Sequence, residues 1–134
     1  MSNPTTGIRV DYKPLDMRQL GESIEAQTGE ALAAKGIIEG GSGTIIVDEI
    51  PITIRVSKEE RGFNVDAYGD PGWRVLFNVV RDYSSRAAVK MVIFDQQYNY
   101  CVCVDRLSTR EQVLKTIEED PFEGERAMKE IGVM

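Results

Sequence analysis

Histidine is absent from the 134 residues of the chain. Without an imidazole there is no Ser-His-Asp or Cys-His nucleophile system, no histidine acid–base catalyst and no zinc site that needs this ligand. Carboxylate, lysine, tyrosine and thiol chemistry stays open, so an enzymatic activity is uncertain. We favour a function without catalysis, and we predict no catalytic residue and no cofactor.

Cysteine is scarce, because the chain has only Cys101 and Cys103. They are weak candidates for metal ligands, since metal sites as a rule need four ligands and only a dimer would bring four thiolates together. On one strand face the two residues would lie about 6.5–7 Å apart, too far for an easy disulfide. We interpret them as free buried thiols, which fits a reducing compartment.

Long hydrophobic runs and clusters of positive charge are also missing. No stretch approaches the ~20 apolar residues of a membrane span, and the polar residues 1–7 give no sign of a secretion signal. The net charge of −6 disfavours binding to nucleic acid backbones. The segment from Glu118 onward contains six acidic and two basic residues. We therefore expect a cytoplasmic protein with neither a membrane nor a nucleic acid as its partner.

The periodicity of hydrophobic residues predicts the domain, strands and helices of the chain. We predict a flexible segment over 1–7, a single domain over 8–120 and a short acidic helix over 121–134. Period-two alternation indicates strands near 8–12, 44–47, 50–57, 63–67, 89–94 and 98–104, with a hairpin about Asp48-Glu49. Capping signals predict one helix over 17–35, ending at Gly36, and another that begins at Ser108.

Residues 71–86 fit either a strand or a helix. Helical spacing places Trp73 and Val80 on one apolar face, whereas strand alternation would put Arg74 on the same face as Val80. An Asp-Pro pair at the start also favours a helix. We therefore predict a helix for this segment.

The segment Gly40-Gly41-Ser42-Gly43 has the composition of a phosphate-binding loop. Such loops lead into the N-terminus of a helix, whereas this one precedes a strand and lacks a following Gly-Lys-Ser/Thr. We interpret it as a flexible connector.

The elements follow the order β-α-β-β-β-α-β-β-α-α, with adjacent strands joined by tight turns. This order predicts the α+β class, with an antiparallel sheet and helices packed mainly on one of its faces.

Two apolar surfaces are candidates for an interface. Tyr98, Tyr100 and Val102 share one face of the last predicted strand, and the two cysteines share the other face. If helices cover one of these faces, the other is available to a partner. The C-terminal helix also carries apolar residues that must pack on this domain or on a second subunit, and these are Phe122, Met128 and Ile131.

The order α-β-β-β-α-β-β-α that follows the first strand is similar to that of class I type III secretion chaperones. The small size, the low pI and the lack of catalytic residues are similar too. This resemblance implies a dimer that binds extended segments of a partner protein. The first strand and the terminal helix depart from the family's pattern, so no functional residue is carried over.

The leading hypothesis is a non-catalytic protein-binding module, chaperone-, adaptor- or inhibitor-like, which acts as a homodimer and binds another protein. The alternative is a small-molecule-binding or carboxylate-dependent enzyme domain, with a pocket between the sheet and the helices.

Overall fold

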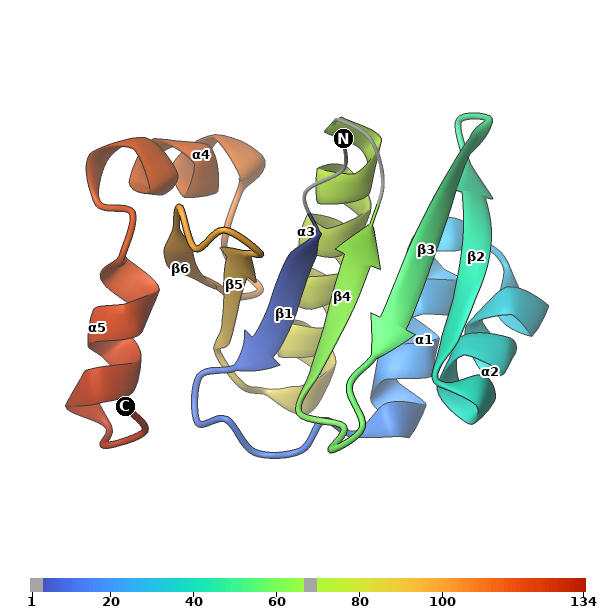
Figure 1. The fold of residues 1–134 in the computed structure, drawn as a ribbon, viewed down its shortest axis with the longest axis horizontal. Coiled ribbons are helices and arrows are strands. Elements are labelled where there is room, and N and C mark those ends of the chain that lie inside the picture. Colours follow the sequence, from blue (N-terminus) through green and yellow to red (C-terminus); the bar gives the residue numbers. More distant parts are fainter. Residues whose placement is uncertain (1–3, 67–69) are drawn as a thin grey trace.

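The structure of the protein is a computed structural model, and it describes residues 4–66 and 70–134. Its centre is a sheet of antiparallel strands in the order β2-β3-β4-β1-β5-β6 (Figure 1). The strands are β1 (Thr5–Arg9), β2 (Ser42–Val47), β3 (Ile50–Val56), β4 (Gly62–Asp66), β5 (Met91–Asp95) and β6 (Cys101–Val104). The helices are α1 (Met17–Thr28), α2 (Ala31–Gly40), α3 (Asp70–Ala87), α4 (Arg110–Glu119) and α5 (Glu123–Glu130).

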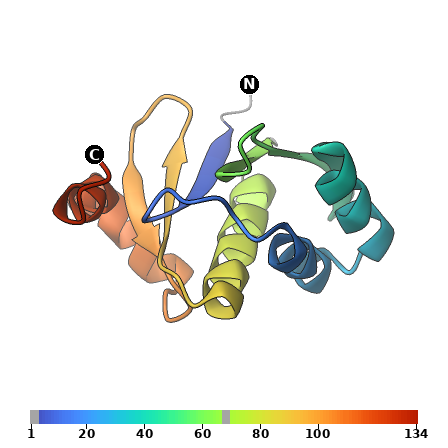
Figure 2. The same cartoon turned by 90° about the horizontal axis from the view of Figure 1, so that it is seen from below.

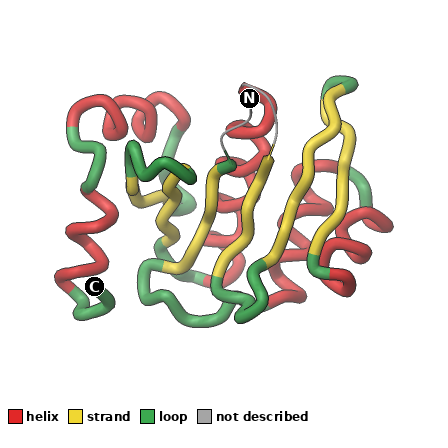
Figure 3. Tube along the Cα trace, viewed as in Figure 1, coloured by secondary structure: helices red, strands yellow, loops and turns green. Residues whose placement is uncertain are grey.

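The helices are divided unequally between the two faces of the sheet. Helices α1, α2 and α3 form a layer on one face, as the view from below shows (Figure 2), and the main core lies between this layer and the strands. Helix α5 stands beside β6 (Figure 3) and packs on a second, smaller cluster of Ile8, Val92, Cys101 and Met128. The predicted α+β class, antiparallel sheet and one-sided helix layer are confirmed.

The predicted helix over 17–35 is wrong in its extent, because the chain forms two helices there. Gly29 ends α1 with a φ of 73°, and its N–H donates to the Glu25 carbonyl at 2.7 Å. An α-helix cannot continue through this left-handed conformation, which glycine adopts without a steric penalty. The predicted end at Gly36 is also wrong, since α2 continues to Gly40 and is capped by Gly41.

Three further segments differ from their predictions. Residues 5–7, expected in a flexible N-terminal segment, belong to β1, which pairs with β4 on one side and with β5 on the other. The segment 40–43 is not a flexible connector, because Gly40 ends α2 and Ser42 begins β2. The N-cap of helix α4 is Thr109, one residue after the predicted Ser108, and Thr109 and Gln112 form its capping box.

The local signals in the middle of the chain are confirmed. Strands β2 and β3 form the predicted hairpin about Asp48-Glu49, and both turn residues have positive φ. Residues 71–86 are helical, and α3 buries its apolar face against the sheet. The predicted strand over 63–67 is present as β4, and its expected last residue, Ala67, lies outside the described residues.

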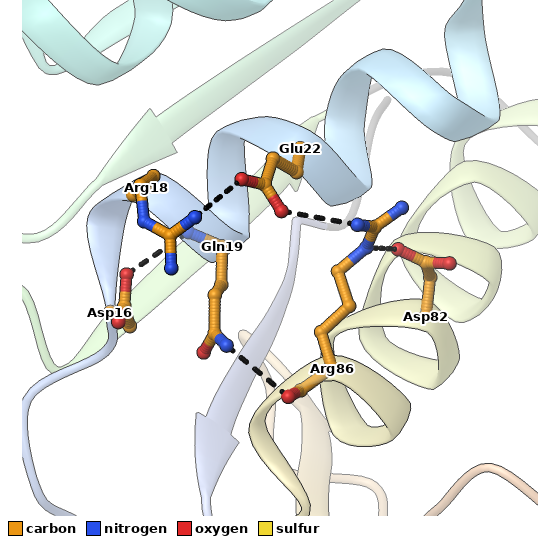
Figure 4. Close-up of polar contacts among 6 residues, drawn as sticks. All are labelled: Asp16, Arg18, Gln19, Glu22, Asp82 and Arg86. Carbon is orange, nitrogen blue, oxygen red and sulfur yellow. Dashed lines mark hydrogen bonds and ion pairs between the residues drawn. The ribbon is translucent and has the colours of Figure 1, made fainter.

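Helices α1 and α3 are joined by one buried and several exposed polar contacts. The buried Tyr83 hydroxyl accepts the backbone N–H of Asp16, the N-cap of α1, at 2.8 Å. At the surface, Arg86 donates to Glu22 at 3.1 Å and to Asp82 at 2.6 Å (Figure 4). A buried hydrogen bond contributes more than a solvent-exposed ion pair, because water competes for the latter.

Removal of the two kinds of contact should therefore have unequal effects. We expect Tyr83→Phe to lower the free energy of unfolding by about 1–2 kcal/mol, because the Asp16 N–H loses its partner. Arg86→Met breaks both exposed ion pairs and should cost less than Tyr83→Phe, because water already competes for the lost contacts. Urea unfolding of both variants measures the two values, and a larger loss for Arg86→Met would contradict this ranking.

Candidate functional site: an apolar cleft beside helix α5

An apolar cleft of about 260 Å³ lies on the sheet face opposite to helices α1–α3. We call it the α5 cleft. Its lining comes from the sheet (Ile8, Phe94 and Cys101), from α5 and the residues after it (Met128, Val133 and Met134) and from two tyrosines in turns (Tyr12 and Tyr98). The cleft thus combines segments from both ends of the chain.

Helix α5 and the residue before Phe122 are held close to β6 by hydrogen bonds from the backbone of the strand. The Cys101 N–H donates to the Pro121 carbonyl at 2.6 Å, and the Cys103 N–H donates to Glu123 Oε1 at 2.9 Å. Gly124 faces the strand so closely that a Cβ atom there would lie 2.9 Å from the Cys101 carbonyl oxygen. Only glycine allows this approach, which fixes the wall of the cleft.

The end of α5 turns the next residues back toward the cleft. Gly132 has a φ of 81°, the Gly132 N–H donates to the Lys129 carbonyl, and the Val133 N–H donates to the Met128 carbonyl. This pair of bonds is a Schellman motif, in which the residue after the glycine contacts the last turn of the helix. Val133 and Met128 therefore line the same cleft. In the sequence, Gly132 just beyond the helix was the signal that could have predicted this turn.

Tyr12 and Tyr98 occupy equivalent positions in two hydrogen-bonded turns. The Tyr12 N–H donates to the Arg9 carbonyl and the Tyr98 N–H donates to the Asp95 carbonyl, each at 3.0 Å. Both residues have a φ of 55°. Buried Asp95 stabilises the second turn, because its carboxylate accepts the Asn99 backbone N–H at 2.6 Å.

The Tyr98 ring forms the aromatic part of the cleft. It lies 5.4 Å from the Phe122 ring and 6.2 Å from the Phe94 ring, measured between ring centroids. Burial raises the pKa of the Tyr98 hydroxyl, and contacts with the Cys101 thiol and the Glu125 carboxylate raise it further. The hydroxyl is therefore a neutral hydrogen-bonding group at physiological pH.

The two thiols are free, as predicted. Burial raises the pKa of Cys101, and burial together with the Glu123 carboxylate raises the pKa of Cys103 to about 12. A thiol with a raised pKa is protonated near neutral pH and is a poor nucleophile or metal ligand. The described residues bring together no group of three or more metal-ligating side chains.

The six residues predicted for an interface do not share one surface. Val102 is fully buried in the main core, and Tyr100 packs against that core. Tyr98 lies on the opposite side with Cys101, because its turn with positive φ interrupts the strand alternation on which the prediction relied. Met128 is buried in the wall of the α5 cleft, the Phe122 ring packs at a tilt against the Tyr98 ring, and Ile131 is exposed near the end of α5.

No protein-family model, curated protein or solved structure matches the chain. The likeness to class I type III secretion chaperones therefore has no support beyond the order of elements and the composition. Among the described helices, none has both the length and the apolar character that a membrane span needs.

The raised pKa of Cys103 predicts a specific loss of stability at high pH. The thiol stays protonated in the folded protein up to about pH 12 but ionises above pH 9 when unfolded. Between these limits the unfolded state binds fewer protons, so the free energy of unfolding falls as the pH rises, by up to about 1.4 kcal/mol per pH unit.

Urea unfolding of wild type and Cys103→Ala at several pH values isolates this effect. The wild type should lose stability more steeply than Cys103→Ala above pH 9, and the two should have parallel pH profiles below it. Parallel profiles over the whole range would show that the thiol ionises normally in the folded protein.

Proposed function

We propose that the protein is a non-catalytic protein-binding module, of the chaperone, adaptor or inhibitor kind, which acts in the cytoplasm. It binds a segment of another protein by seating a large apolar side chain in the α5 cleft. The observation that carries this proposal is the pair of tyrosines in left-handed backbone conformation that line the cleft.

The left-handed conformation is an unusual place for an aromatic residue. It costs an L-residue other than glycine roughly 1–2 kcal/mol, and asparagine or aspartate tolerates it best. Six described non-glycine residues have positive φ, and the two aromatic ones, Tyr12 and Tyr98, both line the α5 cleft. These two residues are 44% and 40% exposed, so burial of the side chain does not offset this cost. A binding role for the rings accounts for their presence.

The size and flexibility of the cleft favour a side chain over a larger ligand. Pockets for drug-sized molecules have volumes of about 300–1,000 Å³, whereas the α5 cleft has about 260 Å³ and is open to solvent. Met128 and Met134 contribute flexible, polarisable side chains that adapt to different anchors. Tyrosine at the rim is typical of protein interfaces.

The charge around the cleft indicates which segments would bind. The chain from Glu118 onward carries six acids and two bases, and it includes the helix that forms one wall. Charge complementarity then favours an apolar anchor flanked by Lys or Arg. We expect such a segment to bind more weakly as the salt concentration rises, because exposed charges are screened.

Selection from a random peptide library on the full chain tests the proposal. Enriched peptides should share a large apolar residue beside Lys or Arg and should bind with a salt-dependent affinity. Tyr98→Asn and Tyr12→Asn should each weaken these peptides at least about tenfold while preserving stability, because asparagine tolerates the left-handed conformation. Leu107→Asn, at a side chain that is 76% exposed outside the cleft, serves as the matched control.

Two results would exclude this use of the cleft. One is selection that yields no enriched peptide, and the other is binding that both tyrosine variants leave unchanged.

The second candidate function is the binding of a small apolar molecule, which the apolar lining of the cleft favours. Native mass spectrometry of the purified protein would support it by showing a bound molecule that Tyr98→Asn releases.

A further inference from the structure

The two edge strands of the sheet differ in whether their outward backbone groups are hydrogen-bonded within the chain. At β6 the outward N–H groups of Cys101 and Cys103 donate to the Pro121 carbonyl and to Glu123, so this edge is closed from within the chain. At the other edge, the Val56 N–H donates to the Gly41 carbonyl. Bonded pairs alternate along an antiparallel ladder, so residues 43, 45 and 47 of β2 also bond β3.

The backbone groups of Ser42, Thr44 and Ile46 therefore point away from the sheet. No described strand pairs with this side of β2. We call it the β2 edge.

Strand β2 has none of the usual protection of an exposed edge. Proteins blunt such edges with charged residues, proline, bulges or very short strands. The six residues Ser42–Val47 include no charge and no proline, and their register with β3 is regular. Ile46 is 56% exposed there. An edge of this kind pairs readily with another strand.

Helix α2 leaves room for a second molecule beside the β2 edge. Ile38 contacts α1 and Ile37 lies over β2, as the close approaches of Gly21 and Gly43 show. Helical geometry then places Gly36 and Gly40 on the flank that faces away from α1. A Cβ atom at either glycine would meet nothing within 4 Å. At these two positions no side chain stands between the flank and a second sheet, and the exposed Leu32 lies one turn before Gly36 on the same flank.

Charge along the β2 edge favours an antiparallel neighbour of the same sequence. Glu49 is exposed in the turn that follows β2, and Arg55 is exposed opposite Ser42 at the other end of the strand. No described residue forms an ion pair with either side chain, whereas Asp48 already pairs with Arg74 at 3.1 Å. An antiparallel second copy places each Glu49 beside the Arg55 end of its partner, and a parallel copy would place like charges together.

We infer that the protein forms a homodimer through its β2 edges, with two antiparallel β2 strands joining the two sheets into one continuous sheet. The occupant of the edge is a second copy of this chain. The interface is separate from the α5 cleft, which stands at the far end of each sheet.

Sedimentation velocity of the full chain from low to high micromolar concentration tests the inference. The wild type should shift from monomer to dimer, and Ile46→Lys should raise the dimer Kd at least about tenfold, because a charge at the edge opposes pairing. Ile131→Lys makes the same exchange at a side chain that is 55% exposed on the opposite side of the molecule. This matched control should leave the dimer intact.

A charge exchange distinguishes this interface from any other. Arg55→Glu and Glu49→Arg should each weaken the dimer, because each places like charges together, and the double variant should restore it. Neither position contributes to the main core, so these variants also test the inference if Ile46→Lys fails to fold. A wild type that stays monomeric at high micromolar concentration overturns the inference. A dimer that Ile131→Lys breaks and Ile46→Lys does not would overturn it as well.

Discussion

The sheet has two edges, and the described part of the chain closes only the one at β6. Closure depends on the approach of α5, where Gly124 faces the backbone of the strand and Glu123 accepts the Cys103 N–H. The same approach creates the α5 cleft, because it leaves the helix wall beside the β1–β5–β6 half of the sheet. The binding site and the asymmetry of the edges are thus two consequences of one packing contact.

The α5 cleft is suited to binding by the character of its lining. Its side chains are apolar or aromatic, its Cys101 thiol has a raised pKa, and Glu123 and Glu125 of α5 lie close enough to act on that thiol. None of these features supplies an activated nucleophile. The two tyrosines instead present rings to solvent from backbone positions that ordinarily suit asparagine or glycine. These properties favour recognition of a partner's side chain over chemistry on it.

The sequence predicted those parts of the fold that depend on local signals. The hairpin about Asp48-Glu49 and helix α3 have patterns that end within a few residues of their observed boundaries. The break at Gly29 was missed, because a single glycine inside a helical pattern costs only about 1 kcal/mol and does not by itself end a helix. Tertiary packing of α2 on β2 decides the outcome there.

The candidate site was predicted only in part, for a related reason. Alternation holds only while a strand is regular, and the turn with positive φ at Tyr98 moved that ring to the side of Cys101. The sequence could not predict that Val133 and Ile8 belong to one apolar cluster, because the two residues come together only after α5 packs on the sheet. The order of strands is likewise non-local, so nothing in the sequence showed that β2 would be an edge.

Amide hydrogen exchange at increasing protein concentration tests the asymmetry of the edges most directly. Cys101 and Cys103 should exchange slowly at every concentration, because their N–H groups are bonded within the chain. Ser42, Thr44 and Ile46 should exchange rapidly in dilute solution and become protected as the concentration rises. Exchange at these three amides that is rapid and independent of concentration would contradict pairing of the β2 edges.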